Sequence, residues 1–309
     1  MGGGRGTRAR PRALDAQPHV AVERLFRGRA LDRDASAALV ASRGVSPRES
    51  ASDRERVTLA ARGVDVAVGA RQLVTDLSLE FCPGEFVAIL GRNGSGKTLT
   101  LLTLAGLRPP QAGAVHLDGV AMDSLSRRAV ALRLGLLAQD VEESFVTTAL
   151  EAVLVGRHPH LELWQWETAA DERIAHQALT SVDLEEFADR RTDTLSGGEL
   201  RRVAVAALLA QEPSIYLLDE PSNHLDPAHQ LGILGLFREL CNAGKMVIAT
   251  LHDPTIAARF ADKALLLFGD GRWAAGPATE LLTAERLSEL YLSPMLELEK
   301  DGRRIFVSA

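Results

Sequence analysis

Gly91-Arg92-Asn93-Gly94-Ser95-Gly96-Lys97-Thr98 lies between two apolar stretches, Phe86–Leu90 before it and Leu99–Leu107 after it. The first stretch is typical of a strand covered on both faces, and the second predicts a helix. A glycine-rich turn between them lets successive main-chain N–H groups converge on an anion without Cβ clashes, at the positive end of the helix. The eight residues therefore predict a phosphate-binding loop of the pattern G-x-x-x-x-G-K-[ST].

Two side chains of this loop suit a bound nucleoside triphosphate. We expect the Lys97 ammonium group to reach the β- and γ-phosphates, and the Thr98 hydroxyl to ligate Mg²⁺. The remaining residues offer main-chain N–H groups to phosphate oxygens. The predicted ATP contacts in this loop are Gly91, Arg92, Asn93, Gly94, Ser95, Gly96, Lys97 and Thr98.

A second apolar strand is predicted at Ile215–Asp219, and it is followed by another acid, Glu220. A carboxylate at a strand tip can hold Mg²⁺, a role that suits Asp219. Glu220 is then placed to polarise an attacking water as general base. His252 follows a third apolar run, Val247–Leu251. At a strand tip next to Asp219 its imidazole would lie near the γ-phosphate and hydrogen bond to it.

The rest of the chain alternates between strand and helix patterns. Leu77–Phe81 alternates apolar and polar residues, as a half-buried strand does. Residues 140–194 are rich in Ala, Glu, Leu and Arg, with the three- and four-residue apolar spacing of inserted helices. Ser214–Leu218 and Met246–Leu251 are short apolar strands separated by a helix at Pro227–Ala243. This alternation predicts a parallel α/β sheet.

The composition limits the class of protein. Of the 309 residues, 46% are hydrophobic and 25% are charged, which is ordinary for a globular protein. No run approaches the ~18 consecutive apolar residues of a membrane-spanning helix. The net charge of −6 argues against nucleic acid as a partner. Cys82 and Cys241 are far apart, which fits a reducing cytosol and excludes a cysteine-based metal site.

The N-terminal segment, residues 1–56, differs from the rest. Residues 1–50 contain ten Arg and five acidic residues, and the chain opens with Met-Gly-Gly-Gly-Arg-Gly. The segment lacks the apolar region of a secretory signal. We expect a disordered extension, or a start placed too far upstream, with order beginning near Val57. Contact of the Arg-rich segment with anionic lipid or nucleic acid is the alternative.

One motif, Leu195-Ser196-Gly197-Gly198-Glu199, lies shortly before the acidic strand. It resembles the signature of ATP-binding cassette (ABC) ATPases. The motif order is also similar to that of the family: the phosphate loop, Gln139, a helical segment, the signature, the acidic strand with Pro221–Asp226, and His252. The resemblance extends from about Val57 to the C-terminus.

The resemblance implies the fold and its boundaries. We expect an α/β P-loop NTPase with a RecA-like parallel sheet core, an antiparallel β edge and an inserted α-helical subdomain at about 140–195. The ABC ATPase domain would comprise residues 57–295, followed by a C-terminal tail at 296–309.

The resemblance also implies a second half of the site. In the family the signature faces the γ-phosphate held by the other subunit, and two cassettes close head-to-tail over two ATP molecules. Because this chain carries one cassette, a homodimer or a paired cassette is implied. Gln139 would sense the γ-phosphate and join Thr98 and Asp219 around Mg²⁺, and Asp226 would pass information across the dimer. The further implied ATP contacts are Leu195, Ser196, Gly197, Gly198, Glu199 and Asp226, and the implied catalytic residues are Lys97, Gln139, Glu220 and His252.

One position departs from the family pattern. ABC ATPases usually stack adenine on an aromatic residue in the first strand region, and the equivalent position here is Val68. Losing that stacking face costs about 1 kcal/mol of the free energy of nucleotide binding. Phosphate and Mg²⁺ contacts should still carry binding, with base selectivity reduced.

Three segments resemble importers of iron chelates, haem and cobalamin: Val155–His160, Leu265–Gly271 and Leu281–Tyr291. The resemblance implies a peripheral subunit on the cytoplasmic face of the inner membrane. Its partners would be transmembrane permease subunits and, indirectly, a periplasmic or surface substrate-binding protein.

Two pairs of side chains in the helical region invite other interpretations. His158 and His160 lack a cysteine or acid at ligand spacing, so we expect a structural role and not a metal site. Trp164 and Trp166 are expected to pack in the core, with contact to the permease as the alternative.

Several other functions remain as alternatives. A soluble ABC ATPase of translation would carry two cassettes, and one of DNA repair would carry a long coiled coil; neither is present in this sequence. A non-catalytic module would lack the acids and His252. An exporter often has fused membrane helices. Import of a different substrate class is also open.

Overall fold

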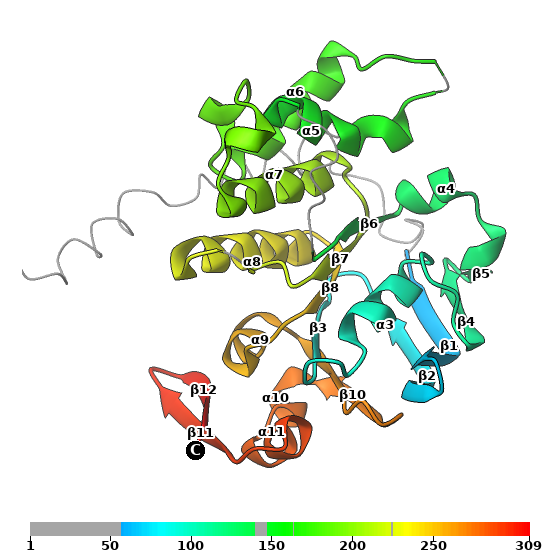
Figure 1. The fold of residues 1–309 in the computed structure, drawn as a ribbon, viewed down its shortest axis with the longest axis vertical. Helices are drawn as coiled ribbons and strands as arrows, with labels where there is room; N and C mark the ends of the chain where they lie inside the picture. The colour runs from blue at the N-terminus through cyan, green and yellow to red at the C-terminus, as the bar shows by residue number, and fades with distance from the viewer. Residues whose placement is uncertain (1–56, 140–146, 163, 224) are drawn as a thin grey trace, which may run out of the picture.

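The computed structural model describes residues 57–139, 147–162, 164–223 and 225–309. They form a central sheet, an antiparallel sheet on one side of it, and a helical subdomain at one end (Figure 1). The predicted N-terminal extension, residues 1–56, lies outside the described residues.

The central sheet has the parallel core that the alternating pattern predicts. Its strands, in order, are β10 (Trp273–Pro277), β9 (Lys263–Leu267), β3 (Phe86–Leu90), β8 (Met246–Thr250), β7 (Ile215–Asp219) and β6 (Leu134–Leu137). All neighbours pair in parallel except β10, which runs antiparallel to β9 at the edge. The carboxyl ends of β3, β7 and β8 therefore meet at one edge of the sheet, where ligands bind in open α/β sheets.

Strand β3 explains why an apolar run without alternation belongs at the centre of this sheet. Phe86, Ala88 and Leu90 pack into one hydrophobic cluster, whereas Val87 and Ile89 pack into the other. Both faces of the strand are therefore covered, and all five residues are buried.

An antiparallel sheet forms the expected β edge. Helix α3 (Lys97–Leu104) packs between this sheet and the central one, in contact with strands of both. Its Leu101 and Leu104 are fully buried there. The elements of this region are β2 (Arg71–Phe81), β1 (Leu59–Val68), β4 (Ala112–Leu117), β5 (Val120–Ala121), the 3₁₀ turn η1 (Met122–Ser124) and helix α4 (Arg127–Ala131).

The main helices of the helical subdomain each begin at a capping box. Thr148, Thr168 and Ser196 each accept a hydrogen bond from the main chain three residues on, and the acid at that position bonds back. Residues 140–146 of the predicted insertion lie outside the described residues. The described elements are α5 (Ala149–Leu154), η2 (Val155–His160), α6 (Ala169–Thr180), η3 (Glu185–Phe187), η4 (Thr192–Thr194) and α7 (Gly197–Ala210).

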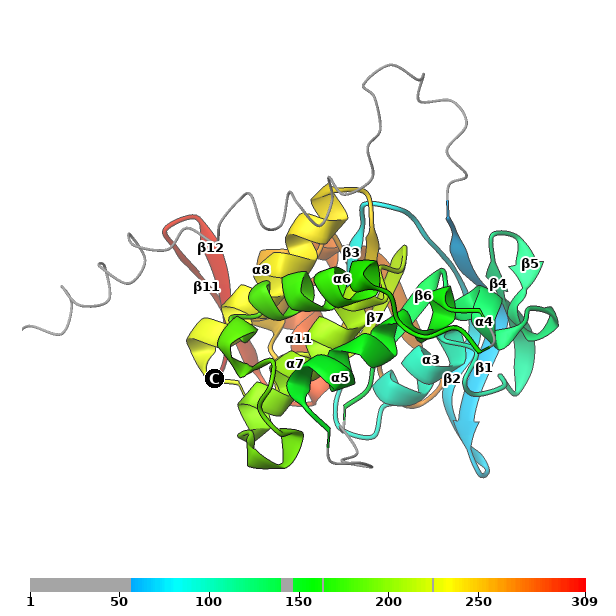
Figure 2. The same cartoon turned by 90° about the horizontal axis from the view of Figure 1, so that it is seen from above.

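The segment predicted as a C-terminal tail forms an ordered hairpin. The hairpin contacts helix α9 (Pro254–Phe260) through β12 (Arg303–Ser308), and Phe306 is buried. In both ribbon views it lies on the opposite side of the molecule from the antiparallel sheet (Figures 1 and 2). The elements of the C-terminal part are α8 (Pro227–Asn242), α9 (Pro254–Phe260), α10 (Ala278–Leu281), α11 (Ala284–Tyr291), β11 (Met295–Lys300) and β12 (Arg303–Ser308).

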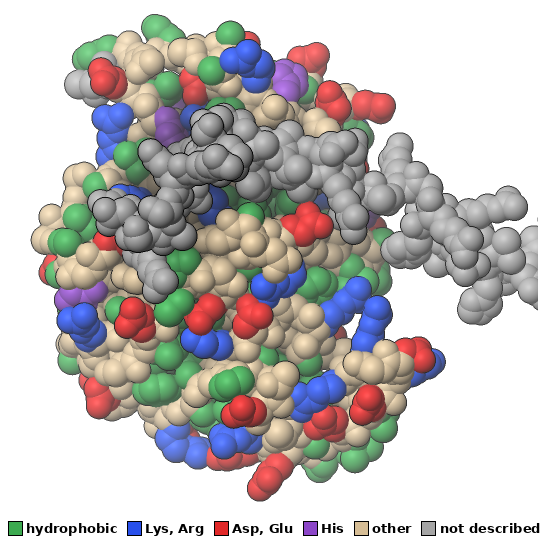
Figure 3. Space-filling model, turned by 180° about the vertical axis from the view of Figure 1, so that it is seen from behind, with side chains coloured by type: hydrophobic (Ala, Val, Ile, Leu, Met, Phe, Trp, Pro, Cys, Tyr) green, Lys and Arg blue, Asp and Glu red, His purple; other side chains and the backbone are tan. Residues whose placement is uncertain are grey.

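The surface carries charges of both signs. On the face seen from behind, acidic and basic side chains are interspersed over the described part (Figure 3). Among the described helices, none is both long enough and apolar enough to cross a bilayer.

Candidate nucleotide-binding site

The glycine-rich loop turns directly from β3 into α3. Gly94 and Gly96 have φ angles of 74° and 102°, which residues with a Cβ rarely adopt. A Cβ on Gly96 would also meet the Leu73 side chain at 3.0 Å. These two glycines therefore allow the sharp turn that places Lys97 at the first position of the helix, as the phosphate-loop pattern predicts.

Hydrogen bonds to the main chain of the loop fix the position of the Lys97 ammonium group. Its Nζ donates to the carbonyl oxygens of Gly91 at 2.9 Å and Arg92 at 3.4 Å, and the residue is buried. Burial lowers the pKa of the Lys97 ammonium group, and the negative charges of Glu220 and Asp219 partly oppose this effect. An incoming phosphate would supply further negative charge to this ammonium group.

The two acids lie where β7 ends, and a threonine of the next strand holds both. The hydroxyl of Thr250 donates to Asp219 Oδ1 at 2.6 Å and accepts from the Glu220 main-chain N–H at 2.8 Å. Asp219 and Thr250 are register partners across β7 and β8. Glu220 itself has a φ of 49°, in the left-handed region. Sequence reasoning did not single out Thr250.

Both oxygens of the Glu220 carboxylate have partners. His252 Nε2 contacts Oε1, and Asn223 Nδ2 donates to Oε2. The predicted proximity of His252 to the acid pair is therefore present. Asn223 lies in the segment Pro221–Asp226 that the sequence marked, but no role had been assigned to it.

Glu220 and His252 line an open cleft of about 580 Å³ together with part of the phosphate loop, whereas Asp219, which is buried, is not among the described residues that line it. Predicted site residues make up most of its lining, and Val68, which is 53% exposed, also lines it. Arg71, Leu73 and Leu99 were not predicted. The cleft is lined by Val68, Arg71, Leu73, Asn93, Gly94, Gly96, Lys97, Thr98, Leu99, Gln139, Glu220 and His252.

Gly91, Arg92 and Ser95 belong to the same loop without lining the cleft. The signature and Asp226 are likewise not among the described residues that line it. Ser196 instead caps α7, where Ser196 and Gly197 are exposed at the positive end of a 14-residue helix. One chain therefore brings together only the phosphate-loop half of the predicted site.

Asp226 caps helix α8. Its Oδ1 accepts from the main-chain N–H groups of Ala228 at 3.0 Å and His229 at 3.1 Å, and its Oδ2 lies 2.7 Å from His229 Nδ1. These hydrogen bonds, led by the one from the His229 main chain, lower the pKa of the Asp226 carboxyl. The predicted role across a dimer stays a prediction.

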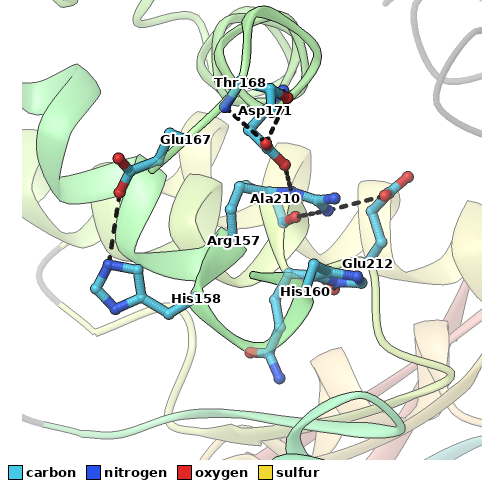
Figure 4. Close-up of polar contacts among 9 residues, drawn as sticks. Arg157, His158, His160, Glu167, Thr168, Asp171, Ala210 and Glu212 are labelled. Atoms are coloured by element: carbon cyan, nitrogen blue, oxygen red, sulfur yellow. Dashed lines mark hydrogen bonds and ion pairs between the residues drawn. The ribbon is translucent and has the colours of Figure 1, made fainter. Parts of the chain in front are cut away.

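The two histidines of the helical region make separate contacts (Figure 4). His160 Nε2 lies 2.9 Å from the carbonyl oxygen of Gln211, and His158 Nε2 lies 3.7 Å from Glu167. Across the described ranges no group of three or more His, Cys, Asp and Glu residues could hold a metal ion.

Arg157 directly precedes His158 in the same turn, and it makes most of the polar contacts of this region (Figure 4). Its Nε donates to Asp171 at 3.0 Å, and its Nη1 donates to the carbonyl of Ala210 at 2.7 Å and to Glu212 at 3.0 Å. Burial raises the pKa of the Asp171 carboxyl, but hydrogen bonds from Thr168 and Arg157 outweigh it and lower that pKa to about 2.

The prediction that Trp164 and Trp166 pack in the core is wrong. Trp164 is 92% exposed and Trp166 is 85% exposed. They lie in the loop before α6, where Trp164 takes a φ of 71°. The core of the helical subdomain is filled instead by residues of the helices, such as Val153 and Leu179.

Comparisons with known proteins agree with this geometry. A sequence model of the ABC transporter family matches residues 74–223. The hemin import ATP-binding protein HmuV of Rhizobium meliloti is 38% identical over 239 residues, which cover 75% of this chain and 90% of that protein. The ferric enterobactin transport ATP-binding protein FepC of Escherichia coli is 38% identical over 224 residues, which cover 72% of this chain and 83% of that protein.

A solved structure of a metal-chelate type ABC transporter in an inward-facing conformation matches with a TM-score of 0.71 at 28% identity. The match covers 82% of this chain and 98% of the other. The phosphate loop, Glu220 and His252 line one cleft, and Asp219 directly precedes Glu220 at the end of β7. Together with relatives of this similarity and coverage, this arrangement leads to one conclusion: the chain belongs to the ATP-binding proteins of the ABC transporter family and is an ATPase.

Proposed function

We propose that this chain is the ATP-hydrolysing subunit of an importer and couples ATP hydrolysis to uptake of an iron siderophore, haem or a cobalamin-type substrate through a separate permease. The observation that carries the proposal is the cleft in which Lys97, Glu220 and His252 meet. The relatives named for hemin and ferric enterobactin transport support the cargo class.

ATP would bind with its phosphates in the loop at residues 91–98 and its base next to Val68. Main-chain N–H groups and the Lys97 ammonium group neutralise the phosphate charge. Glu220 orients and deprotonates the attacking water, and His252, in contact with Glu220, hydrogen bonds to the γ-phosphate. Asp219 is fixed in place by Thr250.

The donor set fits Mg²⁺. Thr98, Gln139 and Asp219 offer a hydroxyl, an amide and a carboxylate, which are the oxygen ligands that this hard cation prefers. When bound, Mg²⁺ neutralises charge on the phosphate oxygens.

Two copies of the chain would form the working unit. The cleft of one chain contains the phosphate loop and the base, whereas the exposed helix start at Ser196 lies elsewhere among the described residues. A helix N-terminus with free N–H groups binds anions. Head-to-tail pairing would present Leu195–Glu199 of one copy to the γ-phosphate held by the other, with Asp226 at the same interface.

The proposed function also implies a cellular location and partner proteins. Permease subunits would hold the dimer at the cytoplasmic face of the membrane as a peripheral subunit, and a periplasmic or surface binding protein would deliver the cargo to the permease. The exposed Trp164 and Trp166 are candidates for the permease contact.

Uptake by cells tests the proposal. Cells lacking this gene would be given labelled haem, a ferric siderophore or cobalamin, with wild-type chain or Lys97→Ala restored. We expect wild type to restore uptake of one cargo and Lys97→Ala to restore none. Wild-type chain that restores none of the three would refute the cargo class and favour another importer class or a soluble ABC ATPase.

A further inference from the structure

A single arginine on the signature helix binds the ends of two strands that carry the catalytic groups. Arg201 lies in the second turn of α7 and is only 3% exposed. Its Nη1 donates to the carbonyl oxygens of Ala138 and, at 3.2 Å, of Gln139. Its Nη2 donates to the carbonyl oxygens of Asp219 at 2.6 Å and Glu220 at 2.9 Å.

The four acceptors belong to two segments that are far apart in sequence. Ala138 and Gln139 follow β6, and Asp219 and Glu220 end β7. The planar guanidinium group, with donors fixed in a fork, can bridge both strand ends at once. Charge-assisted hydrogen bonds of this kind are stronger than neutral ones. Their loss would take a donor from the carbonyl oxygens of Asp219 and Glu220 in a buried site, although that of Glu220 would keep the main-chain N–H of Asn223 at 3.2 Å.

The helix that carries Arg201 begins at the signature. Ser196 caps α7, so any shift of that helix moves the exposed signature at its start and the guanidinium group in its second turn together. The carbonyl oxygens of Gln139 and Glu220 are bonded to that same group, and the side chains of both residues line the cleft.

We propose that Arg201 is a positioning residue that couples the signature of one chain to the catalytic base of the same chain. The inference rests on the proposed dimer, in which a chain's signature serves its partner's ATP and its Glu220 serves its own. When the signature engages the partner's γ-phosphate, α7 is fixed, and Arg201 holds Gln139 and Glu220 in the reactive arrangement. The two ATP sites of the dimer are thereby linked through one side chain in each copy.

If Arg201 had a purely structural role, its replacement would lower stability without a specific loss of coupling between the ATP sites. Arg157→Met serves as the matched control for this possibility. Arg157 is also buried and also donates to a main-chain carbonyl, that of Ala210 at the end of α7, but its hydrogen bonds go to Asp171, Ala210 and Glu212, none of which lines the cleft. Its replacement should lower stability without altering the coupling.

The test uses the purified full-length chain. ATP affinity is measured without Mg²⁺, and turnover is measured with it, as kcat and Hill coefficient. For Arg201→Met we expect ATP affinity close to that of wild type, because the phosphate loop is intact. We expect kcat to fall about 100-fold, the cost of a misplaced catalytic group, and the Hill coefficient to fall to about 1. Arg201→Lys keeps the charge but not the fork, and should recover stability more than cooperativity.

Arg201→Met with wild-type kcat and Hill coefficient would overturn the proposal. So would an equal loss of kcat and cooperativity in Arg157→Met, because it would assign both effects to stability. If Arg201→Met fails to fold, Arg201→Lys is judged by the same two criteria. Wild type that hydrolyses no ATP would contradict the proposed function itself, whereas wild type that hydrolyses ATP without cooperativity contradicts only the coupling.

Discussion

Thr250→Val removes one hydroxyl and leaves a side chain of nearly the same shape. In the wild-type chain this fully buried hydroxyl donates to Asp219 and accepts from the Glu220 N–H. The variant leaves the Glu220 N–H without an acceptor, at about 1–3 kcal/mol, and takes from Asp219 a hydrogen bond worth about 1.5–3 kcal/mol. A buried methyl group returns about 1 kcal/mol. The free energy of unfolding should therefore fall by about 3 kcal/mol.

The same change should weaken the use of Mg²⁺. Asp219 is a proposed Mg²⁺ ligand, and loss of a hydrogen bond that orients a ligand typically weakens metal affinity about 10- to 100-fold. Urea and thermal unfolding followed by circular dichroism measure the free energy of unfolding and the melting temperature, and ATPase rate against Mg²⁺ concentration measures the second effect. We expect a melting temperature roughly 6–12 °C lower and a half-activating Mg²⁺ concentration at least about 10-fold higher.

Thr250→Ser is the matched control. It keeps the hydroxyl and loses one methyl group, so it should cost about 1 kcal/mol and leave the Mg²⁺ dependence unchanged. If Thr250→Val is as stable as wild type and responds to Mg²⁺ in the same way, the hydroxyl does not hold the acid pair and the reasoning is refuted.

The other predictions concern binding, charge and exposure. Lys97→Ala should abolish ATP binding or turnover, measured with labelled ATP, and retained turnover would remove Lys97 from the site. Asp171→Asn should lower the free energy of unfolding by about 2 kcal/mol, because Arg157 loses the more buried of its two acidic partners and keeps Glu212. The folded-state pKa of Asp171 is lowered to about 2, so its contribution is present above its ordinary pKa of 3.8 and lost as pH falls toward 2; acid unfolding of Asp171→Asn should lack that loss. Trp164→Ala with Trp166→Ala should leave the melting temperature unchanged, and a large decrease would contradict their exposure.

Much of the fold can be predicted from local sequence. A short apolar run and the glycine or proline that ends it lie within a few residues of each other, so both can be recognised together. The predicted strand Met246–Leu251 is β8, one residue shorter. The predicted helix Leu99–Leu107 begins two residues earlier, because Gly96 in a left-handed conformation lets the helix start at Lys97. It ends at Leu104, shortly before Gly106 turns the chain with a φ of 66°.

The site residues that sequence reasoning missed depend on contacts between distant segments. Thr250 meets Asp219 only through the register of two strands, and Arg201 meets Gln139 and Glu220 only through the packing of α7. No local pattern encodes these pairs. Trp164 was misjudged because apolar character alone does not decide burial, since much of a folded protein's surface is also apolar.

In the proposed working unit, two chains close over ATP with Glu220 as the base. Glu220→Gln removes the proposed base and keeps the phosphate loop, so ATP should bind without turnover. We would measure its mass in solution with ATP and Mg²⁺, and repeat the measurement in a chain that also carries Lys97→Ala. We expect a dimer that requires ATP for Glu220→Gln alone and single chains for the double variant. Single chains in both, or ATP hydrolysis by Glu220→Gln at the wild-type rate, would contradict it.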